Sequence, residues 1–237
     1  MNDRILARIL LWGLTSLIAL TLAACGGGSS APPSFLTITG SAATGAALSG
    51  ATVSVTCVTG TGTATTQSGG SYTVTVVNGT GPCVITVTSG TTVLTSITPP
   101  IAAGTSAVAN VTPLTTAIVQ ALLVAKGDSP TASPTDLATT KYAPTAADLT
   151  NAVASTITAV NAALPTGAPK LAVGTDLLGG TYNPNSSSDP VDQVLVALTT
   201  NNLTTSTGQI VATVQNTVTA SVQTTVKTNT GGTGAVS

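Results

Sequence analysis

The sequence contains no histidine and no glutamate, and its one tryptophan, Trp12, lies near the amino terminus. Without histidine, the chain lacks the most common general base and the most common ligand of transition metals. Beyond residue 24, six aspartates are the only acidic side chains, and no nucleophile motif accompanies them. We therefore expect no catalytic residue, no metal site and no cofactor.

Charge is scarce as well, because charged residues make up only 5% of the chain. Beyond residue 24, four lysines stand against six aspartates, a formal charge of −2. No cluster of basic residues is available to neutralise phosphates, which argues against nucleic-acid binding and against electrostatic docking on anionic lipid. Hydrophobic residues account for 42% of the chain, the reverse of a disordered composition. The composition predicts a folded body with few surface charges.

Aromatic residues are also few. Beyond residue 24 they are Phe35, Tyr72, Tyr142 and Tyr182. Four rings offer little surface for stacking on sugars, which argues against a platform for glycans. Tyr72 shares a strand face with Val74 and Val76, so we assign it to the core; the alternative is a tyrosine that contacts a ligand.

The amino-terminal region has the three-part layout of a secretory signal. Arg4 and Arg8 are its basic residues, and residues 9–22 form an apolar run. This run is shorter than the ~20 residues that a membrane-spanning helix needs, and small residues followed by glycines end it. The pattern predicts a signal peptide over residues 1–24 rather than a permanent transmembrane helix.

Leu22-Ala23-Ala24-Cys25 closes this signal and resembles the lipobox of bacterial lipoproteins. The resemblance implies that the leader is removed before Cys25 and that this cysteine carries fatty acyl chains such as palmitate, which anchor the mature protein to a membrane. Gly26 stands where the inner-membrane retention signal of that family has aspartate, which favours the outer membrane of a bacterial cell envelope. The alternative is an ordinary signal peptide with a chance cysteine. Residues 25–34, rich in Gly, Ser and Pro, predict a flexible linker.

Residues 35–112 show short runs of alternating apolar and polar residues separated by turn residues, as in an antiparallel all-β module. Cys57 continues the face of Val53 and Val55, and Cys83 continues the face of Ile85. With Cys25 used by lipid, these two inward-facing cysteines are the remaining pair outside the cytoplasm, where disulfides persist. We predict a Cys57–Cys83 disulfide; a redox pair is the alternative, but the spacing is not Cys-x-x-Cys.

The same region resembles the carboxypeptidase-regulatory-like module. The resemblance covers about residues 36–100 and rests on Gly50-Ala51-Thr52-Val53-Ser54-Val55 and on Thr66 followed by Gly70-Ser71-Tyr72. It implies a prealbumin-type β-sandwich without catalytic activity. Two departures from the family pattern are Ser41-Ala42, where valine is common in the first strand, and the missing aspartate before the glycine turn.

Residues 113–228 change to helical spacing. Thr112 is a candidate N-cap with Pro113 at the first helical position, and Leu114, Ile118 and Leu122 then recur every four residues until Lys126-Gly127. The stretch Asn110-Val111-Thr112-Pro113-Leu114-Thr115 also resembles the junction after such β-modules in uncharacterised bacterial surface lipoproteins.

Three more helices are expected in this region. One runs from Asp148 to Leu164, and one starts at Asp189-Pro190. The last follows the four-residue repeat Ile210, Val214, Val218, Val222 and Val226, although its Thr and Val content favours strands. Residues 229–237 are expected to be a disordered tail. The predicted class is thus α+β, an antiparallel prealbumin-like β-sandwich followed by a small bundle-like helical region.

Three functions remain open. The first is a non-enzymatic, lipid-anchored cell-envelope protein with a structural role or a role in binding an envelope protein or glycan. The second is a protein that binds a small ligand or polysaccharide between its two halves, around Tyr142 and Tyr182. The third is an envelope enzyme that uses Asp176, Asp189 or Asp192. For Asp189 and Asp192, helix capping is the simpler explanation, and calcium coordination is the alternative.

Overall fold

The computed structural model describes residues 32–129 and 131–229, with the backbone alone for residues 227–229. The described residues from Pro33 onward belong to one compact unit. The expected signal peptide, Cys25, most of the linker and residues 230–237 of the expected tail lie outside the described residues, so what the sequence implies for them stays a prediction.

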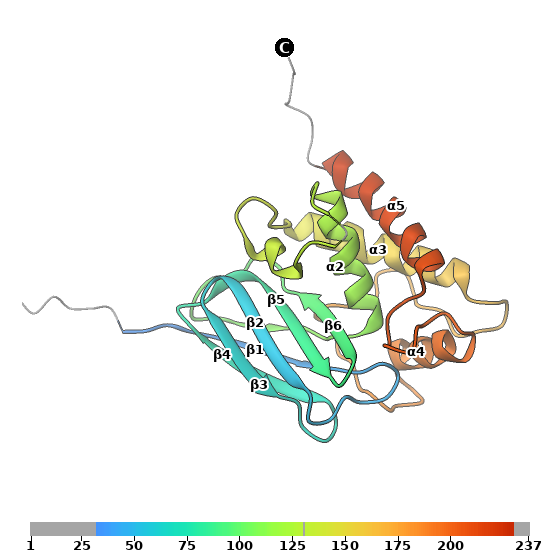
Figure 1. The fold of residues 1–237 in the computed structure, drawn as a ribbon, viewed down its shortest axis with the longest axis horizontal. Coiled ribbons are helices and arrows are strands. Elements are labelled where there is room, and N and C mark those ends of the chain that lie inside the picture. The colour runs from blue at the N-terminus through green and yellow to red at the C-terminus, as the bar shows by residue number, and fades with distance from the viewer. Residues whose placement is uncertain (1–31, 130, 230–237) are drawn as a thin grey trace, which may run out of the picture. The chain divides into compact units, whose positions relative to one another are not determined.

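Seven strands form two sheets within the described residues (Figure 1). They are β1 (Phe35–Ser41), β2 (Thr52–Thr59), β3 (Thr61–Thr65), β4 (Ser71–Val77), β5 (Thr80–Ser89), β6 (Thr92–Ile97) and β7 (Ser106–Val108). One sheet has the order β4-β1-β7 and the other β3-β2-β5-β6. Neighbouring strands run antiparallel, as predicted, except for β1 and β7, which are parallel.

The two sheets bury their apolar side chains in one shared cluster. Leu36 and Ile38 of β1 lie in it together with Val53 of β2 and Ile85 of β5. Strand β4 alternates strictly between exposed and buried residues. The assignment of Tyr72 to the core is confirmed, because its side chain is buried and its hydroxyl donates to the carbonyl oxygen of Ala109. Burial raises the pKa of Tyr72.

The second sheet is buried on its outer face as well. Val84 of β5 and Ile97 of β6 belong to the cluster formed by the helices, whereas Ile85, their neighbour in the sheet, belongs to the cluster between the sheets. The alternation of period two therefore breaks along β5, where Cys83, Val84 and Ile85 are all buried. Helix α2 (Pro113–Ala125) lies against this face, next to β6 (Figure 1).

Helix α2 begins and ends where the sequence predicts. Thr112 is the N-cap, Pro113 is the first helical residue and Lys126 is the C-cap. Thr112 and Thr115 form a capping box, which satisfies main-chain N–H groups that the first helical turn leaves without partners. Most of the helix surface is buried, so the predicted apolar stripe extends around nearly the whole helix.

The other helices differ from the prediction mainly at their starts. Helix α3 (Ala146–Ala163) begins before Asp148, because Thr145 is its N-cap and Asp148 occupies the third helical position. Helix α5 (Ala212–Asn229) is a helix, as its four-residue valine repeat predicts, but Ile210 precedes it and pairs with Thr204 instead. A short 3-10 helix, η1 (Pro134–Ala138), was not expected.

Helix α4 (Pro190–Thr200) begins as predicted, with Asp189 as its N-cap. Its apolar residues join those of α2, α3 and α5 in one buried cluster. Within this cluster, α2, α3 and α5 contact one another pairwise (Figure 1). The valine stripe of α5 is buried here: Val214, Val218, Val222 and Val226.

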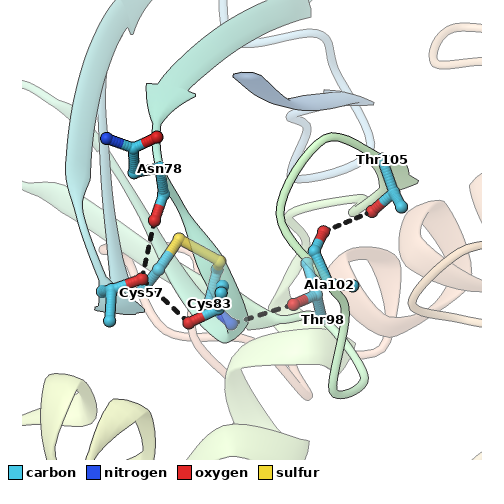
Figure 2. Close-up of a disulfide and its surroundings, with 8 residues drawn as sticks. Cys57, Asn78, Cys83, Thr98, Ala102 and Thr105 are labelled. Carbon is cyan, nitrogen blue, oxygen red and sulfur yellow. Dashed lines mark hydrogen bonds between the residues drawn. A yellow bond between two sulfur atoms is a disulfide. The ribbon is translucent and has the colours of Figure 1, made fainter. Parts of the chain in front are cut away.

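The predicted disulfide is present and joins β2 to β5 (Figure 2). Cys57 and Cys83 are directly opposite each other in the register of the two strands, and both are buried. The main-chain N–H of Cys83 also donates to the hydroxyl of Thr98, 2.9 Å away. The disulfide therefore crosses the middle of a sheet rather than closing an exposed loop.

Candidate functional site

A cavity of about 500 Å³ lies between the β-strands and the helices. One wall consists of β7 and the connection that precedes it, including Pro99 and Ile101. The opposite wall is the first half of α3, and the third is the turn formed by residues 174–179. The cavity thus lies between the two halves of the chain, as the second of the three functions requires of a ligand site.

The lining of the cavity is mostly apolar. Its apolar side chains include Val108 of β7, Val153 and Ile157 of α3, and Leu178 of the turn. Val108 is 42% exposed, although valine in a strand is usually packed. Asp176 is the one charged residue of the lining. Such a lining suits a ligand that is largely apolar and carries at most one positive group.

Asp176 stabilises the turn that closes the cavity. Its Oδ1 accepts hydrogen bonds from the N–H groups of Leu178, at 3.1 Å, and Gly179, at 2.9 Å. A Cβ atom at Gly180 would collide with the carbonyl oxygen of Asp176, so the turn requires glycine at this position. The Asp176 side chain is exposed, and its second carboxylate oxygen makes no hydrogen bond within the described part of the chain.

Asn110 fixes this turn to the sheet. Its main-chain N–H donates to the carbonyl oxygen of Leu178 at 2.7 Å, and its side-chain Nδ2 donates to that of Gly180, also at 2.7 Å. Its Oδ1 accepts from the N–H of Ser41 at 3.3 Å. Sequence reasoning missed this role, because Asn110 has no apolar pattern around it that predicts burial. The junction that begins at Asn110 therefore positions one wall of the cavity and starts α2.

The two candidate ligand tyrosines do not line the cavity. Tyr182 is buried, and its hydroxyl donates to Oδ1 of Asp192 at 3.2 Å. Burial, together with the Asp192 carboxylate, raises the pKa of Tyr182. Tyr142 packs against the helical core, with the Lys141 ammonium 4.5 Å from the centre of its ring.

Asp189 and Asp192 hold the start of α4 and the loop before it. Oδ1 of Asp189 accepts from the N–H groups of Val191 and Asp192, and Oδ2 accepts from the N–H of Asn183. Buried Asp192 accepts from Tyr182 and from the N–H of Asn185. The capping role predicted for Asp189 is confirmed. In residues 32–129 and 131–229, no three His, Cys, Asp or Glu side chains are grouped closely enough to bind a metal ion.

None of the helices in the described residues is long and apolar enough to cross a membrane. Comparisons with models of protein families, with curated proteins and with solved structures find no match for this chain.

Proposed function

We propose that this chain is a non-enzymatic protein of the cell envelope, anchored through lipid on Cys25, that binds a largely apolar ligand in the cavity between β7 and α3. The cavity carries this proposal. Its volume of about 500 Å³ falls in the range of small-molecule sites, and such sites combine apolar walls with a few polar groups. Asp176 and Thr150, both in the lining, supply such polar groups here.

The hydrogen bonding of the aspartates supports a non-enzymatic role. Of the three candidate carboxylates, Asp189 and Asp192 hold helix α4 and its preceding loop, and only Asp176 reaches the cavity. A general acid or base works with a second group at the reacting bond. The sequence has no histidine or glutamate to be that partner.

The β-half fits the prealbumin-type sandwich that the sequence resemblance implies. Two sheets that share one buried cluster are the defining feature of a sandwich. In this proposal the module serves as a rigid wall for the cavity, since β7 belongs to its first sheet.

Ligand binding can be tested with N-phenyl-1-naphthylamine, a neutral apolar probe whose fluorescence rises in an apolar site. We expect saturable binding to the purified protein. Ala154→Phe fills the cavity from α3 and should weaken binding at least tenfold. Ala147→Phe is the matched control, because residue 147 is an exposed alanine of the same helix that does not line the cavity. No saturable binding, or equal binding by both variants, would refute the cavity as a ligand site.

The membrane anchor requires a separate test. Cells are fed an alkyne-labelled palmitate, and the protein is isolated and examined for the label. The wild type should carry the label and sediment with membranes, whereas Cys25→Ala should carry none, because lipid attaches through the cysteine thiol. A variant with Cys57→Ala and Cys83→Ala is the control and should keep the label. Equal labelling of the Cys25→Ala variant would contradict the lipobox interpretation.

A further inference from the structure

An open strand edge lies in the wall of the cavity. Within the described residues, the edge strands of the first sheet are β4 and β7, and those of the second sheet are β3 and β6. Strands β3 and β4 pack against each other, with Gly62 directly against Val74. The edge of β6 is covered by α2, since Thr116 Oγ1 accepts from the N–H of Thr95 at 2.9 Å and Thr115 Oγ1 donates to its carbonyl oxygen at 2.7 Å. Along Ser106–Val108, strand β7 has no hydrogen-bonded cover of this kind, although the carbonyl oxygen of Val108 lies near Gly179 of the turn.

The hydrogen bonds of β7 show which of its main-chain groups face outward. Toward β1, Thr37 N–H donates to Thr105 at 3.1 Å, and Ala109 N–H donates to Thr39 at 2.8 Å. Along a strand, successive residues direct their main-chain groups to opposite edges. The odd-numbered residues therefore bond to β1, and Ser106, Val108 and Asn110 direct their N–H and C=O groups to the other edge.

The outward edge already accepts one partner. The N–H of Asn110 bonds to the carbonyl oxygen of Leu178 at 2.7 Å, which confirms the outward direction of the even-numbered residues. At Ser106 and Val108, the main-chain N–H and C=O groups form no hydrogen bond to any residue that the structure describes. Both residues are exposed and both line the cavity.

We infer that the ligand of this cavity is an extended peptide that adds to β7 as a strand, with an apolar side chain in the cavity. This inference deepens the proposed function and rests on it. An added strand supplies N–H and C=O groups at the two-residue spacing of Ser106 and Val108. One side of the peptide then points into the apolar space between Val108 and Val153. A basic group on the peptide would pair with Asp176, the one charge in the lining.

Hydrogen exchange can test the strand pairing. The probe is a fluorescein-labelled, amidated hexapeptide in which valine and threonine alternate and the last residue is lysine. On addition of this peptide, the amide protons of Ser106 and Val108 should exchange at least tenfold more slowly, as followed by NMR. The amide of Ala109 is the internal control, because its N–H already bonds to Thr39. Peptide binding that leaves the exchange of Ser106 and Val108 unchanged would overturn the inference.

Two substitutions at one position separate main-chain pairing from side-chain packing. Val108→Pro removes the outward N–H without removing a bond to β1, and proline is tolerated in edge strands. Val108→Ala shortens the side chain and keeps the N–H. We expect fluorescence anisotropy to show at least tenfold weaker peptide binding for Val108→Pro than for Val108→Ala. Ser106→Pro repeats the test if Val108→Pro fails to fold, as judged by circular dichroism.

The same titrations distinguish this inference from the function on which it rests. If the wild type binds N-phenyl-1-naphthylamine but not the peptide, the cavity is a ligand site and the strand pairing is wrong. If it binds neither, the proposed function itself fails. Equal peptide binding by the proline and alanine variants would likewise reject pairing along β7.

Discussion

Asp148→Asn should lower the free energy of unfolding by about 3–5 kcal/mol, the usual cost of removing one partner from a buried ion pair. Oδ2 of Asp148 accepts from Lys126 Nζ at 2.5 Å and from the N–H of Thr145 at 2.8 Å. The aspartate side chain is 1% exposed and that of Lys126 is 11% exposed. The carboxylate therefore joins the C-cap of α2 to the first turn of α3. The substitution leaves the Lys126 ammonium largely buried without a counter-charge.

Urea unfolding of the variant and the wild type measures this loss. Asp136→Asn is the control, because it removes a negative charge at the start of η1 and should cost less than about 1 kcal/mol. Adding Lys126→Met to Asp148→Asn should restore part of the stability, since an apolar pair leaves no buried charge. A loss below 1 kcal/mol for Asp148→Asn would show that the ion pair contributes little.

The same carboxylate predicts the direction in which stability changes with pH. Burial raises the pKa of Asp148, but the hydrogen bonds from Lys126 and Thr145 outweigh it and hold this pKa below its ordinary value. In the unfolded chain the carboxyl has a pKa of about 3.9. Its contribution is therefore complete above that value and is lost as the pH falls through the lower pKa of the folded state. Between pH 5 and about pH 2, the free energy of unfolding should therefore fall less for the Asp148→Asn variant than for the wild type.

Local features of the fold could be read from the sequence, because the residues that determine them are close in the chain. Thr112 and Pro113 predict the start of α2 from adjacent positions. The valine repeat of α5 identifies a helix despite its strand-favouring composition, since burial of one face outweighs the small helix penalty of β-branched residues. The start of α3 was misplaced, although the spacing of Thr145 and Asp148 is that of a capping box.

The cavity could not be predicted in the same way. Its walls come from residues as far apart as Ile101, Val153 and Asp176, and no local pattern marks them. The position of its third wall depends on Asn110, a polar residue whose three hydrogen bonds reach Ser41 of β1 and the carbonyl oxygens of Leu178 and Gly180. The aromatic residues were a misleading guide, because Tyr182 instead bonds to Asp192 within the fold. Asp148 posed the same difficulty, since its partner Lys126 lies 22 residues away, at the C-cap of α2.

The disulfide is central to the stability of the β-half. It joins residues 26 apart in the sequence, and a loop of that length corresponds to about 3–4 kcal/mol of loop-closure free energy in the unfolded chain. Both cysteines lie in the cluster that the two sheets share. Removing the disulfide therefore releases a constraint between β2 and β5 inside that core.

Replacing both cysteines, as Cys57→Ala with Cys83→Ala, should therefore lower the free energy of unfolding by about 3–4 kcal/mol. Reduction of the wild type should produce a loss of similar size, because it opens the same loop while keeping both side chains. Reductant should have no effect on the double variant, which serves as the matched control. In the folded, unreduced protein, mass spectrometry after iodoacetamide treatment should find neither Cys57 nor Cys83 alkylated. Alkylation of both would mean that they are free thiols, and the stability of the β-half would then depend on its apolar packing alone.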